Sequence, residues 1–231
     1  MTNTPMQPAE WIETLDRLRE VSNDLQSQSI LGIDTESNSL YVYKEQVCLI
    51  QISSPTNDYL IDPLAIKDMS PLAPVLASTS VEKVFHAAEY DILCLKRDFD
   101  FEIHNIFDTM LASRALGHKN TGLGSILEEK YGIQAEKKYQ RANWGKRPVN
   151  KDMFKYAQMD SHFLIEIRNQ FHEELAAKDR LALVKEDFIR LTKIEPPKAA
   201  TYEEDAWKLA NGHNYHSKQI SVLMALCKYR D

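Results

Sequence analysis

Acidic residues interrupt apolar segments at three separate places in this chain, and this pattern limits the folds that it can adopt. Asp34 and Glu36 lie at the end of the apolar run that begins at Ile30. Because side chains alternate between the two faces of a strand, both carboxylates point the same way. Like charges this close repel each other unless a cation lies between them. An exposed strand end with two solvated acids is the alternative explanation.

The second interruption lies on a predicted helix. An apolar stripe along the helix expected over Ala88–Phe99 also contains Asp91. A charge within such a stripe is costly to bury unless something compensates it. Asp91 also lies near the start of this helix, where the helix dipole stabilises an anion, so a purely structural explanation is open.

The third interruption fills a gap in another buried stripe. This stripe runs from Met153 to Phe171 on a helix that Asn150 is expected to cap, and Asp160 stands within it. Tyr156 precedes Asp160 by one helical turn, so the two side chains share a face. Core packing and a hydrogen-bonded buried acid are the alternatives. Three interruptions together favour one site, and oxygen-rich clusters prefer hard cations such as Mg²⁺ or Mn²⁺.

The apolar patterns predict an α/β fold in which helices flank both faces of a mixed sheet. Short turns separate the first three predicted strands, which favours adjacent antiparallel pairing. Helix and strand then alternate, and the last part of the chain is predicted to be helical. The expected elements are a helix at Ala9–Leu25, strands at Ile30–Glu36, Gln46–Ser53 and Asp58–Ile61, a helix at Leu72–Ala77, strands at Lys83–His86 and Ile103–Phe107, and a helix at Leu123–Tyr131.

The C-terminal part is predicted to be a separate segment. Pro196 and Pro197 indicate a linker, which divides the chain into a domain over residues 1–195 and a segment over residues 196–231. Two helices are expected in this segment, at Tyr202–Leu209 and Ser217–Arg230. The second ends without a capping residue, as the incomplete start of a further helical domain would.

Composition restricts the cofactors and the compartment. The three cysteines lie far apart in apolar stretches, which predicts buried reduced thiols, and the seven histidines lack zinc-binding spacing. No apolar run approaches the ~20 residues of a membrane span. The first twenty residues lack the apolar centre of a secretory signal. We therefore expect a cytoplasmic protein that does not contact a membrane.

Basic residues gather in one segment although the net charge of the chain is −6. Between Lys137 and Lys155 there are seven lysines and arginines and one acid. Tyr139, Trp144 and Phe154 are interleaved among them, a mixture that suits phosphate contact and base stacking along a single strand. A solvated loop without a partner is the alternative.

The acidic residues resemble the three motifs of the DEDD exonucleases, in the subgroup with a tyrosine in the third motif. Asp34-x-Glu36, Asp91 and Tyr156-x-x-x-Asp160 follow one another in the order of those motifs. Each motif alone is weak, whereas all three together with their flanking residues are specific.

Longer stretches are similar to ribonuclease D, over roughly Ile30 to Phe171. These stretches are FHAAEYDILCL, FDTMLASRAL and KKYQRANWGKRPVNKDMFKYAQMDSHFL. The similarity resumes at Ala206–Arg230, which resembles the segment leading into the helicase-and-RNase-D C-terminal (HRDC) domain of that family.

The resemblance implies an RNase H-like fold that carries a 3′–5′ exoribonuclease. Asp34, Glu36, Asp91 and Asp160 would bind two divalent cations, Mg²⁺ or Mn²⁺, and Tyr156 would orient the attacking water. Cations about 3.5–4 Å apart lower the pKa of a bound water and stabilise the leaving oxygen.

The resemblance also implies contacts with the substrate, which would be the single-stranded 3′ end of an RNA such as a tRNA precursor. Leu40 would wedge against the terminal base, with ordinary packing as its alternative. Thr35, His86, Arg141 and Trp144 would contact the strand.

Two other functions are open. One is a DNA exonuclease of the same class, and the other is a nucleic-acid-binding module that has lost catalysis. The presence of all four carboxylates and of the tyrosine argues against the second. The sequence does not identify a protein partner.

Overall fold

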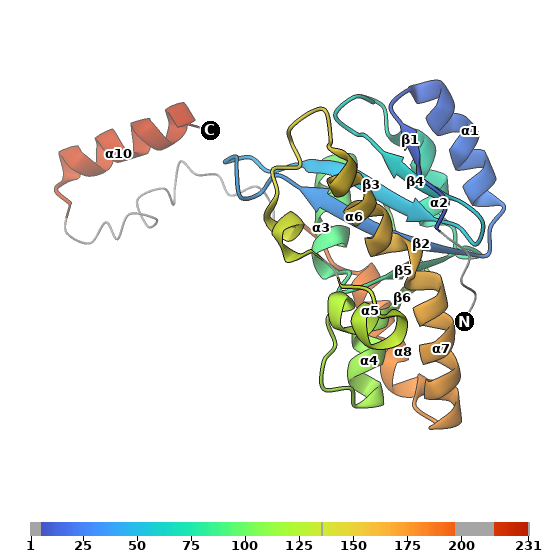
Figure 1. The fold of residues 1–231 in the computed structure, drawn as a ribbon. Helices are drawn as coiled ribbons and strands as arrows, with labels where there is room; N and C mark the ends of the chain where they lie inside the picture. The colour runs from blue at the N-terminus through green and yellow to red at the C-terminus, as the bar shows by residue number, and fades with distance from the viewer. Residues whose placement is uncertain (1–5, 135, 197–214, 231) are drawn as a thin grey trace. The chain divides into compact units, whose positions relative to one another are not determined.

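Six strands form one mixed sheet in the part of the chain that the structure describes, in the order β1-β4-β3-β2-β5-β6 (Figure 1). The structure is a computed structural model and describes residues 6–134, 136–196 and 215–230. Contacts divide the chain into two units, Met1–Glu195 and Pro196–Asp231. The sheet lies entirely in the first unit, whose strands are β1 (Glu10–Ile12), β2 (Ile30–Ser37), β3 (Val47–Ser53), β4 (Asp58–Ile61), β5 (Glu82–Phe85) and β6 (Ile106–Asp108).

The pairing of the central strands confirms the prediction from their spacing. β2 and β3 are antiparallel, as are β3 and β4. β5 is parallel to β2, and β6 is parallel to β5. β3 is therefore buried between two neighbours, and all seven of its residues are buried.

The predicted opening helix at Ala9–Leu25 is wrong in its first part. Glu10–Ile12 instead forms β1, which pairs in parallel with β4, and the helix α1 spans Leu15–Gln26. Thr14 marks the boundary, because its side chain accepts a hydrogen bond from the backbone N–H of Arg17 at 3.4 Å. A strand of three residues is too short to show an alternating pattern, so pairing with the distant β4 decides its conformation.

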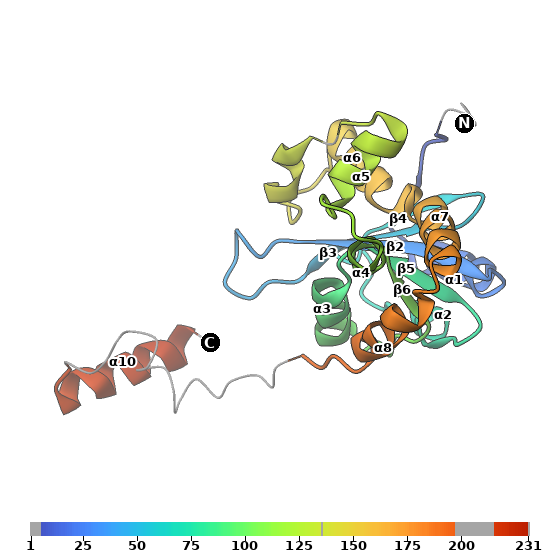
Figure 2. The same ribbon diagram turned by 90° about the horizontal axis from the view of Figure 1, so that it is seen from below.

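Helices cover both faces of the sheet (Figure 2). Apolar side chains of α1, α2 and α3 pack in one cluster with Ile50 and Ile52 of β3. Side chains of α6 pack on the opposite face with Leu49 of β3 and Leu60 of β4. The helical elements after α1 are η1 (Ser70–Leu72), α2 (Ala73–Ala77), α3 (Glu89–Phe99), α4 (Thr109–Leu116), α5 (Leu123–Tyr131), η2 (Lys137–Arg141), α6 (Lys151–His162), α7 (Leu164–Ala177), α8 (Leu181–Thr192) and α10 (Ser217–Arg230).

The predicted stripe from Met153 to Phe171 is divided between α6 and α7, which meet at Phe163. Asn150 caps α6 as predicted, with its side chain 2.9 Å from the backbone nitrogen of Met153. The junction lies directly on β2 at Gly32. A β-carbon added there would be 2.6 Å from the carbonyl oxygen of Ser161, so only glycine allows this approach.

The second unit contains α10, which has the bounds predicted from the sequence. The predicted helix at Tyr202–Leu209 lies outside the described residues. The assignment of this unit as the start of an HRDC-type domain stays a prediction. Within the described ranges, no helix has the length and apolar character needed to cross a membrane. The three cysteines are buried and unpaired, as predicted.

Candidate active site

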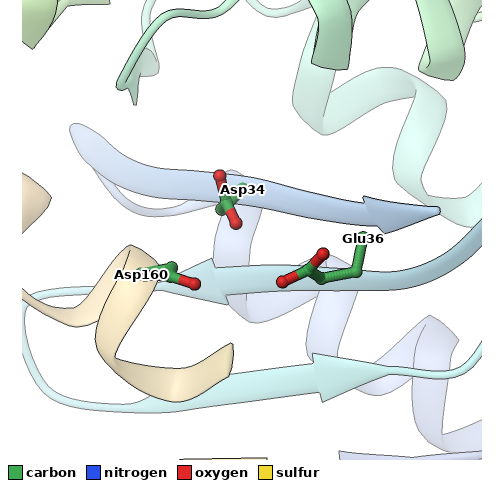
Figure 3. A group of neighbouring side chains, drawn as sticks. All are labelled: Asp34, Glu36 and Asp160. Atoms are coloured by element: carbon green, nitrogen blue, oxygen red, sulfur yellow. The ribbon is translucent and has the colours of Figure 1, made fainter. Parts of the chain in front are cut away.

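Three carboxylates meet where α6 crosses β2 (Figure 3). Asp34 and Glu36 extend from β2, and Asp160 comes from the last turns of α6. One oxygen of each side chain lies within 4.8 Å of the others. The close approach at Gly32 places α6 over β2, so the packing of the helix on the strand brings Asp160 to Asp34 and Glu36. We call these three residues the carboxylate cluster.

Asp91 lies beside the carboxylate cluster but is not one of its three members. It comes from the first turn of α3, on the face of the sheet opposite α6. The Thr35 hydroxyl donates a hydrogen bond of 2.5 Å to Asp91 Oδ1. The predicted contact of Thr35 with substrate stays a prediction, and its hydroxyl is engaged with Asp91. The sequence placed four acids in one ligand set, and the structure brings three of them together with the fourth adjacent.

The environment of these acids opposes their ionisation. Burial raises the pKa of Asp34 well above its usual range, and the charges of Asp91, Asp160 and Glu36 raise it further. Burial also raises the pKa of Glu36. The pKa of Asp91 and that of Asp160 rise to about 7, with burial as the largest cause in each. The charges that act most on Asp34 are all negative.

These properties fit a divalent cation. The donors are carboxylate oxygens, which Mg²⁺ and Mn²⁺ prefer. A cation among them would relieve the mutual repulsion that raises the pKa of Asp34. Asp34, Glu36 and Asp160 are close enough together to share one ion.

Tyr156 lies at the edge of the carboxylate cluster with its ring buried. Burial raises its pKa, and the charges of Asp160, Glu36 and Asp34 act in the same direction. A hydrogen bond from the hydroxyl stabilises ionised Asp160 and partly offsets the effect of burial on that acid. The ring centroid is 5.5 Å from that of Tyr139 and 6.3 Å from that of Trp144. The ring therefore belongs to the core, whereas the hydroxyl faces the acids.

Comparison with known proteins decides the family. Residues 9–176 match the family described as 3′–5′ exonuclease. The chain belongs to this 3′–5′ exonuclease family. Its match covers the whole sheet from β1 to β6 and includes the carboxylate cluster.

The relatives are longer than this exonuclease chain. Identity is 37% over 166 residues with protein RRP6-like 3 of Arabidopsis thaliana, and 32% over 237 residues with the exosome complex exonuclease RRP6 of Saccharomyces cerevisiae. The alignments cover 71% and 96% of this chain but 19% and 32% of those relatives.

Solved exonuclease structures share the fold. The catalytic core of RRP6 from Trypanosoma brucei has a TM-score of 0.83 at 29% identity, over 96% of this chain and 63% of that one. RNase D of Escherichia coli is described as an exoribonuclease involved in structured RNA processing. Its TM-score is 0.79 at 26% identity, and the match covers 97% of this chain and 60% of that one. These likenesses confirm the predicted RNase H-like fold.

A polar network that the sequence did not indicate fixes α6 of the exonuclease fold on the sheet. Asp58 Oδ2 lies 2.6 Å from Gln158 Nε2 and 2.7 Å from His162 Nδ1. The hydroxyls of Ser53 and Ser161 are 2.8 Å apart. Burial acts to raise the pKa of Asp58, but the hydrogen bonds to it outweigh burial and lower the pKa. Its α6 members, Gln158, Ser161 and His162, lie on both sides of Asp160 in the sequence, so the network holds the helix that carries Asp160 in place.

Asp108 supports the site from the other side of the sheet and was also missed. It is buried and caps α4, accepting hydrogen bonds from the backbone N–H groups of Met110 and Leu111 at 2.8 and 3.0 Å. Its other oxygen accepts a hydrogen bond of 2.8 Å from the backbone N–H of Ala88. Asp108 thereby fixes the start of α3, which carries Asp91. An aspartate directly before a helix was a usable capping signal.

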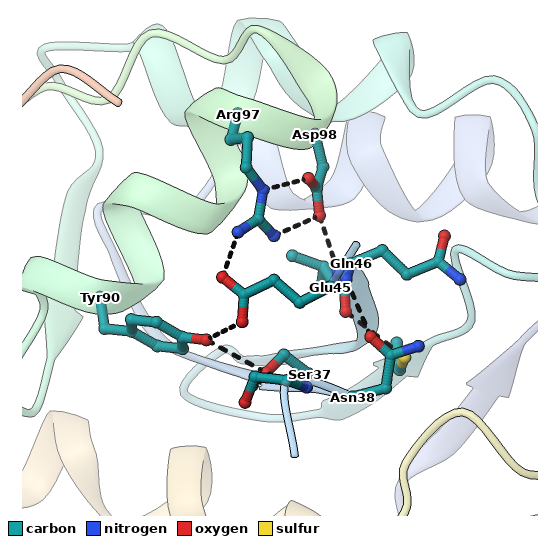
Figure 4. Close-up of polar contacts among 10 residues, drawn as sticks. Ser37, Asn38, Glu45, Gln46, Tyr90, Arg97 and Asp98 are labelled. Carbon is teal, nitrogen blue, oxygen red and sulfur yellow. Dashed lines mark hydrogen bonds and ion pairs between the residues drawn. The ribbon is translucent and has the colours of Figure 1, made fainter. Parts of the chain in front are cut away.

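The loop between β2 and β3 leaves the strand one residue after Glu36 and is fixed at its base (Figure 4). Glu45 accepts hydrogen bonds from the Tyr90 hydroxyl at 2.6 Å and from the Arg97 guanidinium. The carboxylate of Asp98 accepts one of 2.6 Å from the backbone N–H of Val47. These contacts anchor the loop to α3.

The tip of this loop carries exposed apolar side chains. Leu40 is 62% exposed, so the alternative of ordinary packing is wrong for it, and its predicted wedge role stays a prediction. The Tyr41 hydroxyl donates a hydrogen bond of 2.6 Å to the backbone carbonyl of Arg141. The loop therefore contacts the basic segment, in which Arg141 and Lys146 are exposed.

The predicted contact of Trp144 with the substrate strand is wrong. Trp144 is 1% exposed and its Nε1 donates to the carbonyl of Tyr139 at 3.2 Å, so it packs under the segment and presents no face to a base. Arg147 binds buried Asp62 through two nitrogens, at 2.6 and 2.7 Å, and is structural.

His86 lies against α4, and its predicted contact with substrate stays a prediction. Its Nδ1 is 2.9 Å from the Thr109 hydroxyl. Burial lowers its pKa to about 4, so the ring is neutral at physiological pH.

Proposed function

We propose that this protein is a metal-dependent 3′–5′ exoribonuclease that releases 5′-mononucleotides from single-stranded RNA ends. The carboxylate cluster is the observation that carries the proposal, since its three acids lie within 4.8 Å of one another in a site that disfavours their charges. Membership of the exonuclease family supports the reaction class. The names of the RRP6 and RNase D relatives support RNA as the substrate.

Each residue near the cluster has a proposed task. Asp34, Glu36 and Asp160 would hold one divalent cation, and Asp34 with Asp91 close by would hold a second. Two bound cations supply a water of lowered pKa and stabilise the leaving oxygen of an in-line displacement. The Tyr156 hydroxyl, which faces Asp160, orients the attacking water. Thr35 keeps Asp91 in place.

The loop between β2 and β3 and the basic segment would receive the RNA strand. Leu40 and its exposed neighbours offer apolar surface for bases within a few residues of Glu36. The exposed side chains of Arg141 and Lys146 supply positive charge for phosphates. The hydrogen bond from Tyr41 to Arg141 keeps these two surfaces together.

The similarity to ribonuclease D supports tRNA precursors in the cytoplasm as the substrate class and the location that we propose.

A comparison of four labelled substrates tests this function. A linear RNA labelled at its 5′ end should shorten one nucleotide at a time, and the same RNA labelled at its 3′ end should release labelled mononucleotide at once. A DNA strand of the same sequence should be degraded much more slowly, and a circular RNA should survive. Faster degradation of the DNA would favour the DNA exonuclease, and binding without release would favour the non-catalytic module.

A further inference from the structure

Gln51 of β3 lies directly opposite Asp34 of β2 in the antiparallel register. Its side chain is fully buried, at 0% exposure. Gln51 Nε2 lies 3.5 Å from Asp34 Oδ2, and Gln51 Oε1 has no hydrogen-bond partner among the described residues. The carboxylate cluster thus has a buried, half-satisfied amide beside it.

The position of Gln51 in its strand makes this unpaired oxygen informative. Leu49, Gln51 and Ser53 form the row of β3 that faces α6, because alternate residues share a face. Leu49 is apolar, and the hydroxyl of Ser53 is paired with that of Ser161. Buried polar atoms in folded proteins are nearly always paired, so an orphan here points to a partner that arrives with the cation.

The chemistry of an amide suits the neighbour of a metal ligand. A lysine or arginine opposite Asp34 would neutralise the carboxylate and compete with a cation. An acid would add a further negative charge beside Asp34, which the neighbouring carboxylates already repel. The amide can donate to the carboxylate without changing the charge of the site, and it retains an oxygen that can accept.

We propose that Gln51 is a positioning residue for Asp34. Nε2 donates to Asp34 Oδ2 and so fixes the orientation of the carboxylate toward the cation. Oε1 accepts a hydrogen bond from water that accompanies the bound cation. The inference rests on the proposed function, since it needs a cation at the carboxylate cluster. Partners that orient ligating carboxylates commonly affect metal affinity or activity by about 10–100-fold.

Replacement of Gln51 by methionine tests the inference, because methionine has a similar volume and cannot donate. Calorimetric titration of Gln51→Met with Mn²⁺ should show an affinity at least ten-fold below wild type, and kcat on linear RNA should fall while KM for RNA changes little. The melting temperature without cation should stay the same or rise, since an unpaired buried oxygen has been removed.

Leu60→Met is the matched control. Leu60 is fully buried on the same face and pairs with Gln51 from the side away from Asp34. This variant should keep wild-type affinity for Mn²⁺ and wild-type kcat. If Gln51→Met matches it in both, Gln51 only fills space and the inference is wrong.

A measurement on the unmodified protein covers the case in which Gln51→Met does not fold. The side-chain amide of Gln51, observed by ¹H–¹⁵N NMR, should shift during titration with Mg²⁺ in step with cation binding. A signal that does not move as Mg²⁺ binds would overturn the inference. Failure of the wild-type protein to bind Mn²⁺ or to degrade RNA would instead contradict the proposed function, so the two failures are distinguishable.

Discussion

At the scale of single residues, the site is a set of acids placed where the fold disfavours their charge. Burial and mutual repulsion both raise the pKa of Asp34. Thr35 holds Asp91 by its hydroxyl, and the Tyr156 hydroxyl interacts with Asp160. The two hydrogen bonds favour the ionised acids only in part, because burial raises the pKa of Asp91 and of Asp160 more strongly. A divalent cation would supply the missing positive charge.

Tyr156 and Asp160 share a helical face but should fail differently when changed. Asp160→Asn removes a charge from the carboxylate cluster and should weaken Mn²⁺ binding together with kcat. Tyr156→Phe keeps the ring that packs on Tyr139, so the fold and the metal affinity should be preserved. Loss of one positioned hydrogen bond lowers turnover by about 10²–10³. We expect a fall of that size in kcat for Tyr156→Phe, with Mn²⁺ affinity by calorimetry near wild type.

The two readouts separate chemistry from packing. Near-normal turnover in Tyr156→Phe would restrict the residue to its role in the core. Joint loss of turnover and Mn²⁺ affinity in this variant would mean that the hydroxyl supports the cation site itself.

The raised pKa values predict how stability depends on pH. The pKa of Asp91 and that of Asp160 rise from an ordinary value of 3.8 to about 7. Between these values the folded protein binds protons that the unfolded chain releases, so this contribution to stability is largest at low pH and is lost as the pH rises through about 7. The melting temperature without cations should therefore fall between about pH 4 and pH 7.

Cations should reverse this fall. Mg²⁺ competes with protons for the same oxygens, so it should raise the melting temperature more at about pH 8 than at pH 5. Asp160→Asn removes one of the two groups and should show a smaller fall with pH. An effect of Mg²⁺ on melting that is equal at both pH values would show that the cation binds elsewhere.

At the scale of secondary-structure elements, the approach of α6 and α7 to β2 assembles the site. A β-carbon at Gly32 would lie 2.6 Å from a backbone oxygen that cannot move easily. Gly32→Ala should therefore cost about 1–3 kcal/mol, as overpacking does, and should displace Asp160 from Asp34. We expect a lower melting temperature and a lower Mn²⁺ affinity.

Gly122→Ala is the control for this substitution, since a β-carbon at Gly122 meets open space and the backbone there has a φ of −75°. It should change stability by less than about 1 kcal/mol and leave Mn²⁺ affinity intact. Wild-type Mn²⁺ affinity in Gly32→Ala would mean that this packing does not set the position of Asp160.

Elements with strong local patterns could be predicted from the sequence. The helices Leu123–Tyr131 and Ser217–Arg230 have the predicted bounds, and the three central strands pair as expected. β1 could not be predicted, because its three residues extend only through pairing with β4. The division between α6 and α7 could not be predicted either, since the apolar stripe continues across it and contact with Gly32 sets the junction.

The prediction of individual site residues is limited in the same way, by contacts between residues that are distant in sequence. The acids could be found because a charge within an apolar stripe is unusual at any position. The role of Trp144 was predicted wrongly, because an aromatic residue among basic residues looks the same in sequence whether it faces solvent or the core. Gln51 and Asp58 were missed because their roles depend on neighbours that are distant in sequence.

At the scale of the whole molecule, a chain of net charge −6 could bind a polyanion only through a local basic surface. Arg141 and Lys146 are exposed in the basic segment, whereas Arg147 is engaged with Asp62. Each phosphate contact with a single strand contributes about 0.7 to the slope of log affinity against log salt. Arg141→Ala with Lys146→Ala should therefore reduce that slope by about 1.4 in a titration of RNA at several salt concentrations.

Lys178 and Lys185, at the end of α7 and on α8, provide a matched pair of exposed lysines. Their replacement by alanine should leave the slope unchanged. If both double variants behave alike, the basic segment does not bind the strand.

We infer above all that the carboxylate cluster acts through divalent cations on RNA 3′ ends. The most direct measurement follows a 5′-labelled RNA with wild type and Asp34→Asn across a titration of Mg²⁺ that begins in chelator. We predict a ladder that shortens from the 3′ end only with wild type and only as Mg²⁺ is added, with Asp34→Asn inactive throughout. Degradation in chelator, or equal degradation by Asp34→Asn, would contradict the account.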